Sequence, residues 1–267
     1  MPIGFDKFAE GVGKTIETVP EFYNDGLKPA TQESGKTLAL LPRTINAALI
    51  PLRMWIAKKE YNLTELEKLL AKKLEHVDEN KIVTPEPYVA IPAIQAISYS
   101  MDSKELRNLY ANILAKSMNS DTKDFVHPSF VEIIKQLTPL DSLIFNHIST
   151  KMRTPVINLS LSTNDSDNSR NNWIKNITDF TFSEDYKLIS ISIDNLLRLG
   201  LIEIPYKRKI TDITQYDSVR NSIHFKKAKI RLQKLIAKGI GKKIKMQLNY
   251  IQKTSLGIAF KEICVDD

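Results

Sequence analysis

The spacing of apolar residues changes along this chain, and that change constrains the fold more than any other feature. In the front part, apolar residues recur every three or four positions, which is typical of amphipathic helices. The clearest stretch is 106–117, where apolar residues follow helical spacing without interruption. Near the C-terminus, residues 244–250 alternate strictly between apolar and polar, which predicts a strand with one wet face. We therefore expect a mainly helical protein that contains a small amount of sheet.

A polar stretch ends the long front helix and suggests a division into two domains. We expect a helical domain over residues 1–124 and a second, winged-helix-like α+β domain over 125–267. In the second domain, a helix around 184–199 stops at Gly200, a favourable position for a helix C-cap. The expected continuation is a strand at 201–204, a return strand at 244–250 and a final helix that Thr254 caps. Helix, strand, return strand and helix is the order of a winged helix with a small antiparallel sheet.

A long basic insert separates the two expected strands, roughly over residues 207–243. The chain has a formal charge of +7, whereas the stretch 206–253 carries fourteen Lys or Arg against two acids. A charge imbalance of this kind suggests an anionic partner, either nucleic acid or lipid head groups, although a solvated basic surface fits equally well. The centre of the insert, 222–238, has the pattern of a basic helix. The candidate contact residues are Lys226, Lys227, Lys229, Arg231, Lys234, Lys238, Lys242 and Lys243.

The most apolar window of the chain covers residues 38–56. Prolines and arginines interrupt it too often for a transmembrane helix, which needs about 20 predominantly apolar residues. Two interpretations stay open: a segment that acts on a membrane, or the buried central helix of the front domain. The residues that would carry either role are Leu41, Leu49, Ile50 and Trp55.

No arrangement of side chains in the sequence points to catalysis, a metal or a cofactor. The single cysteine, Cys264, excludes an intramolecular disulfide and a cysteine-based zinc site, and it suits a reducing cytoplasm. The run Asp121, Asp124 and His127 has a spacing that a metal site could use, but helix caps explain it better. Ser129 beside His127 lacks the nucleophile elbow of a hydrolase. We also find no dinucleotide or P-loop motif, and no signal peptide opens the chain, so we expect a cytoplasmic non-enzyme.

Several long motifs resemble one protein family. The stretch 105–115 reads ELRNLYANILA, and 127–137 reads HPSFVEIIKQL. Earlier motifs are GLKP at 26–29, LP at 41–42, PLR at 51–53 and VTPEP at 83–87, followed by PA at 92–93. Together these motifs resemble the abortive infection alpha family of bacteria, over most of the chain.

The resemblance implies a link to bacterial defence against phage, and it assigns no catalytic residue. We therefore expect a phage-defence protein that acts by binding a phage or host component. Two alternatives remain: a winged-helix regulator that binds DNA, and a membrane-active effector of growth arrest that uses residues 38–56. The expected location is the cytoplasm, with membrane association on activation in the last case.

Overall fold

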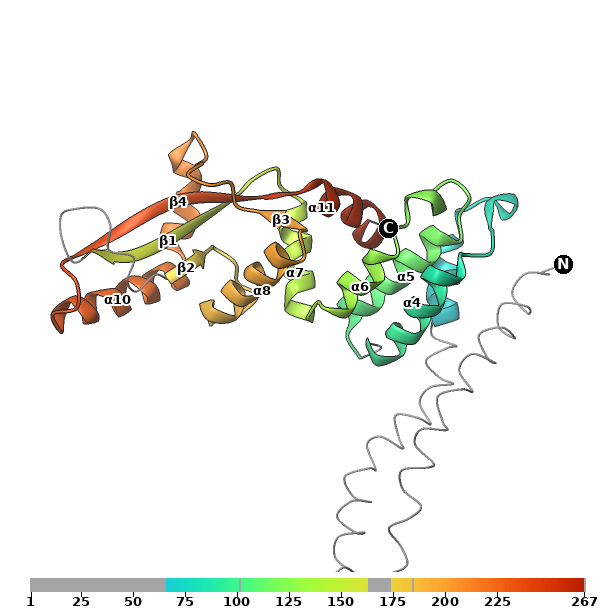
Figure 1. Cartoon of the computed structure of the whole chain (residues 1–267), viewed down its shortest axis with the longest axis horizontal. Coiled ribbons are helices and arrows are strands. Elements are labelled where there is room, and N and C mark those ends of the chain that lie inside the picture. The colour runs from blue at the N-terminus through green and yellow to red at the C-terminus, as the bar shows by residue number, and fades with distance from the viewer. Residues whose placement is uncertain (1–65, 101, 163–173, 184, 267) are drawn as a thin grey trace, which may run out of the picture. The chain divides into compact units, whose positions relative to one another are not determined.

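The structure is a computed structural model, and it describes residues 66–100, 102–162, 174–183 and 185–266 (Figure 1). The chain divides into two compact units, Met1–Asp102 with Tyr110–Pro128, and Ser103–Leu109 with Ser129–Asp267. The described residues are mainly helical and include one antiparallel sheet, as the apolar spacing predicts. The apolar window at 38–56 lies outside the described residues.

The described part of the first unit is mainly helical, with one isolated β-bridge between Ile82 and Asn119. A helical stretch at 66–74 is followed by the 3-10 turn η2 (Glu79–Lys81) and by α4 (Pro87–Ser100), which begins at a proline as first helical turns often do. The predicted amphipathic helix is confirmed as α5 (Lys104–Ser117), whose residues up to Leu109 belong to the second unit, and a further 3-10 turn, η3 (Lys123–Phe125), follows it. The buried core of the first unit includes Leu66, Leu70, Leu74, Val89, Ala93, Ile97, Tyr110, Ile113 and Leu114.

Two short helices open the second unit after Pro128. The first, α6 (Ser129–Lys135), begins at Ser129, the residue beside His127. The second, α7 (Pro139–Ser149), is capped by Thr138, because the Asp141 backbone N–H donates to Thr138 Oγ1 over 3.1 Å. The Thr138 N–H donates in turn to Asp141 Oδ2 over 2.7 Å, which completes a capping box.

Four described strands form the sheet, in the order β2-β1-β4-β3 (Figure 1). They are β1 (Thr154–Ser162), β2 (Ile174–Ile177), β3 (Ile202–Glu203) and β4 (Lys243–Lys253), and every pairing is antiparallel. The pairing of β1 with β4 runs over nine residue pairs, whereas β3 pairs with β4 over two. The sequence predicted strands at 201–204 and 244–250, which correspond to β3 and β4, but it did not predict β1 and β2. The centre of the observed sheet is the pair β1 and β4, and not the expected pair β3 and β4. The winged-helix arrangement stays a prediction.

The elements around β3 and after β4 follow the sequence prediction. Helix α8 (Tyr186–Arg198) has Leu199 as its C-cap, and Gly200 follows with a φ of +72°. The Leu201 N–H donates to Leu196 O over 3.1 Å, so the glycine permits a left-handed turn directly before β3. Thr254 caps α11 (Ser255–Phe260) by accepting from the Gly257 N–H over 2.9 Å, and one π-helical turn (Lys261–Val265) follows.

The basic insert contains η4 (Ile213–Tyr216), α9 (Asp217–Asn221) and α10 (Ile223–Ala237). Helix α10 agrees closely with the basic helix predicted over 222–238. Tyr216 is fully buried, its hydroxyl accepts from the Ile210 N–H over 2.9 Å, and burial raises its pKa. The insert shares one core with the sheet, formed by Ile157, Leu159, Leu161, Ile174, Ile177, Ile210, Tyr216, Val219, Ala228, Leu232 and Tyr250.

Candidate anion-binding surface

Helix α10 is well terminated at both ends. At its start, Ser222 Oγ accepts from the Phe225 N–H over 3.1 Å. At its end, the Gly239 N–H donates to Ile236 O and the Ile240 N–H donates to Leu235 O, both over 2.9 Å. These two bonds form a Schellman motif around Gly239, whose φ of +79° is unfavourable for other residues. The caps fix the length of α10 independently of any bound partner.

One face of α10 is fixed in the core of the unit. His224, Ala228 and Leu232 are buried, and they lie four residues apart, which places them along one side of the helix. His224 Nε2 lies 2.9 Å from Phe180 O, so the start of the helix is also tied to the segment that follows β2. Because this inner face is packed, the orientation of the opposite face is set.

The candidate cations lie outside this buried face. All eight side chains are exposed, six on α10 or its C-cap and two where β4 begins. We call this set the basic face: Lys226, Lys227, Lys229, Arg231, Lys234, Lys238, Lys242 and Lys243. The segment 223–243 contains no Asp or Glu. Among the described residues, no ion pair with a carboxylate is formed by Lys226, Lys229 or Lys234.

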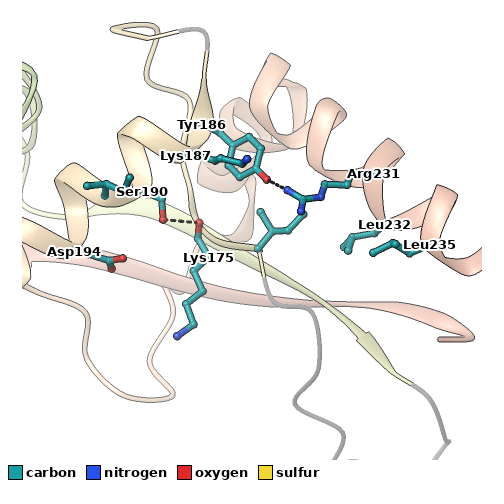
Figure 2. A pocket seen from close by; sticks show the side chains of 10 residues that line it. Lys175, Tyr186, Lys187, Ser190, Asp194, Arg231, Leu232 and Leu235 are labelled. Carbon is teal, nitrogen blue, oxygen red and sulfur yellow. Dashed lines mark hydrogen bonds between the residues drawn. The ribbon is translucent and has the colours of Figure 1, made fainter. Parts of the chain in front are cut away.

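An open groove of about 460 Å³ borders the basic face (Figure 2). Arg231 and Tyr186 point toward one another across it, and Arg231 Nη1 donates to Tyr186 Oη over 2.7 Å. Lys187 lies beside this pair, whereas the side chain of Lys175 points away from it. The groove is lined by Ile174, Lys175, Tyr186, Lys187, Ser190, Ile191, Asp194, Arg231, Leu232 and Leu235.

The acid in this groove already has a partner. Asp194 Oδ1 accepts from Asn176 Nδ2 over 2.8 Å, and Asn176 adopts a positive φ of 58° within β2. The Asn176 N–H donates to Asn158 Oδ1 over 2.8 Å, which joins β2 to β1 where their register shifts. Asp194 therefore stabilises an irregular strand, and the groove keeps a surplus of positive charge.

Sequence reasoning found the basic face but missed the groove. Tyr186 and Arg231 are 45 residues apart, and β2, which contributes Ile174 and Lys175, is only four residues long. No local pattern connects these segments. The only available signal was that an amphipathic helix precedes the basic insert.

Of the other candidate residues, Asp121 forms an ion pair and Cys264 is buried. Asp121 forms an ion pair with Lys81, with Oδ2 and Nζ 2.7 Å apart. The hydrogen bond and charge of Asp121 raise the pKa of Lys81. Within residues 66–100, 102–162, 174–183 and 185–266, no group of three or more His, Cys, Asp or Glu side chains is placed to hold a metal ion. Cys264 is fully buried, and burial raises the pKa of its thiol well above the usual range, which disfavours the reactive thiolate.

The predicted membrane or core segment falls on a part of the chain that the structure does not describe. Leu41, Leu49, Ile50 and Trp55 all lie outside the described residues. Of the helices that the structure describes, none combines the length and apolar character needed to cross a membrane.

Comparisons with known proteins give one family and one solved structure. The family model described as "Abortive infection alpha" matches residues 58–264. No curated protein matches the chain. An uncharacterised protein from the marine bacterium Alcanivorax borkumensis SK2 is similar in structure, with 14% sequence identity and a TM-score of 0.35. That similarity covers 55% of this chain and 96% of the other.

Proposed function

The chain belongs to the abortive infection alpha family, and from this premise we propose that it acts in bacterial phage defence by binding an anionic partner, and not by catalysis. The basic face of α10 and β4 is the proposed contact surface. The proposal takes the protein to be cytoplasmic, which suits its single, buried cysteine.

The observation that supports this proposal most is the separation of the two faces of α10. The inner face is buried, whereas every candidate cation from Lys226 to Lys243 is exposed. Side chains closer than about 8 Å are only weakly screened at physiological ionic strength, so neighbouring lysines repel one another. A bound polyanion would relieve that repulsion. Because this repulsion raises the free energy of the unbound protein, it favours the binding of phosphates.

The experiment reverses two charges at the centre of the basic face. We expect Lys229→Glu combined with Lys234→Glu to elute from a heparin column at clearly lower salt and to lose phage protection. A lysine near an anionic surface contributes about 1 kcal/mol, so losing two weakens binding about thirtyfold, and reversal weakens it further. Binding is measured as a function of salt, and protection as phage plating efficiency.

The matched control makes the same change of charge elsewhere in the second unit. Lys104 and Lys151 are also exposed, so Lys104→Glu with Lys151→Glu tests net charge alone. We expect this variant to keep both heparin binding and protection. Full protection by a folded Lys229→Glu, Lys234→Glu variant would contradict the proposal.

A winged-helix regulator of DNA is the second candidate, and the order α8, β3, β4 and α11 favours it. Such a regulator should select one duplex sequence over others, because base contacts supply specificity and phosphate contacts do not. Equal affinity for unrelated duplexes would argue against this role.

A further inference from the structure

Two isoleucines interrupt the basic face. Ile223 is 54% exposed and Ile230 is 51% exposed, although both belong to a helix whose inner face is fully packed. They are seven residues apart, close to two helical turns, and therefore lie on the same side of α10. Exposed branched side chains at this spacing form an apolar line and not two unrelated surface residues.

Cations flank this apolar line on both sides. A helix turns about 100° per residue, which places Lys226 on one side of the line and Lys227 and Lys234 on the other. Ala228 and Leu232 point in the opposite direction, into the core. Going around the outer surface of α10, the order is therefore cation, isoleucine, cation. Ile240, which follows the helix, is also exposed.

This arrangement fits a lipid bilayer better than a nucleic acid. On a nucleic acid duplex, the lysines would contact phosphates, but the isoleucines between them would contribute no binding free energy. At an anionic bilayer, lysines contact the headgroup phosphates while apolar side chains between them enter the boundary with the acyl chains. With no carboxylate between residues 223 and 243, nothing in the helix repels that surface.

Helix α8 provides an internal comparison. It also exposes two aliphatic side chains, Leu188 at 50% and Ile191 at 63%. Its charges are balanced, however, because Asp185 and Asp194 accompany Lys187 and Arg198. Exposed apolar residues alone do not distinguish α10; their combination with cations in a segment that lacks acids does.

We propose that α10 is a membrane-docking helix: Ile223 and Ile230 insert at the headgroup–acyl boundary of an anionic bilayer while the basic face contacts lipid phosphates. The inference rests on the proposed function, since it names the anionic partner. It requires no membrane-spanning helix, because α10 lies in the plane of the surface.

The test measures how the full chain binds lipid vesicles. Vesicles of phosphatidylcholine with and without phosphatidylglycerol are sedimented with the wild type, with an Ile223→Ser, Ile230→Ser variant of α10, and with a Leu188→Ser, Ile191→Ser variant of α8. We expect wild-type binding only to the anionic vesicles. The α10 variant should bind them at least about tenfold more weakly, because it loses two buried aliphatic side chains. The α8 variant should bind like the wild type.

Heparin binding separates this inference from the proposed function. Serine in place of Ile223 and Ile230 leaves all eight cations in place, so we expect unchanged elution from heparin. Equal vesicle binding by the wild type and the α10 variant would overturn the docking inference, as would an equal loss in the α8 variant. Binding to duplex DNA without binding to anionic vesicles would also overturn it and leave the proposed function standing. Failure to bind heparin, DNA and vesicles would remove both.

Discussion

The two ends of β4 differ in how they are held. At the C-terminal end, Asn249, Tyr250 and Ile251 are buried, and the strand pairs with β3 as well as β1. At the N-terminal end, Lys243 is exposed and Met246 is 46% exposed. One strand thus runs from a tightly packed region into a partly open one.

The difference lies in what contacts the strand. At the packed end, Thr254 binds the segment before β3 through both its backbone and its side chain: its N–H donates to Leu201 O over 3.2 Å, and its Oγ1 donates to Gly200 O. At the open end, β4 still pairs with β1 as far as Lys243, and α10 packs against this sheet through its buried side chains with its outer face exposed. We infer that the packed end sets stability, whereas the open end can change its charges and surface residues at little cost.

The largest effect should follow from Gly257→Ala at the packed end. A Cβ at this position would lie 1.9 Å from Leu201 O, so the start of α11 must move away from β3. We expect a loss of about 4 kcal/mol in the free energy of unfolding, in the range that only severe mechanisms produce. Urea denaturation measures it.

Gly239, which lies between the end of α10 and the open end of β4, is the control for this substitution. A Cβ at Gly239 would meet nothing within 4 Å, but the φ of +79° is unfavourable for alanine. Gly239→Ala should therefore cost only about 1 kcal/mol, from the backbone conformation alone. Similar costs at the two glycines would show that the ends of β4 are held alike.

A second pair of substitutions compares the two faces of α10. Leu232 is buried in the core with the sheet, so Leu232→Ala should cost about 3 kcal/mol through lost burial and the resulting cavity. Ile230, two residues earlier, is half exposed, and Ile230→Ala should change stability by no more than about 0.5 kcal/mol. Thermal and urea unfolding measure both. A large cost at Ile230 would mean that another part of the chain covers the outer face.

Much of the fold could be predicted because its signals are local. The cap at Thr138, the stop at Gly200 and the start of α11 at Thr254 each depend on a few neighbouring residues. The strand β1 was missed, because both of its faces are largely buried. Its sequence, TPVINLSLS, places Pro, Val and Ile consecutively and buries serines, so the simple alternation that identified β4 is lost.

The candidate site, like the fold, has one part that the local sequence predicts and one part that it does not. Eight cations on one short segment are visible in the sequence, and so is the basic helix that carries most of them. The groove depends on Tyr186, Lys187 and Arg231 meeting through the packing of α8, β2 and α10, which no local pattern encodes. Exposure of Ile223 and Ile230 is also a tertiary property, since sequence alone places isoleucines in the core.

The smallest expected effect compares one lysine at each end of β4. Lys253 Nζ donates to Ser149 O over 2.8 Å and to Lys151 O over 3.0 Å, at the C-terminal end of α7. A cation there satisfies helix carbonyls and interacts favourably with the helix dipole. Burial, and then the charge of Lys261, lower the pKa of Lys253, so part of this gain is offset.

We therefore expect Lys253→Met to cost about 1 kcal/mol, because the alkyl chain is kept while two carbonyls lose their donor. Lys243→Met should leave stability unchanged, since no described carboxylate forms an ion pair with Lys243, and should weaken heparin binding instead. Both variants are measured by chemical denaturation and by heparin elution. If the ends of β4 have separate roles, Lys253→Met loses more stability and Lys243→Met loses more heparin binding. If Lys253→Met weakened heparin binding as much as Lys243→Met, the anionic partner would extend along the whole strand and the division would fail.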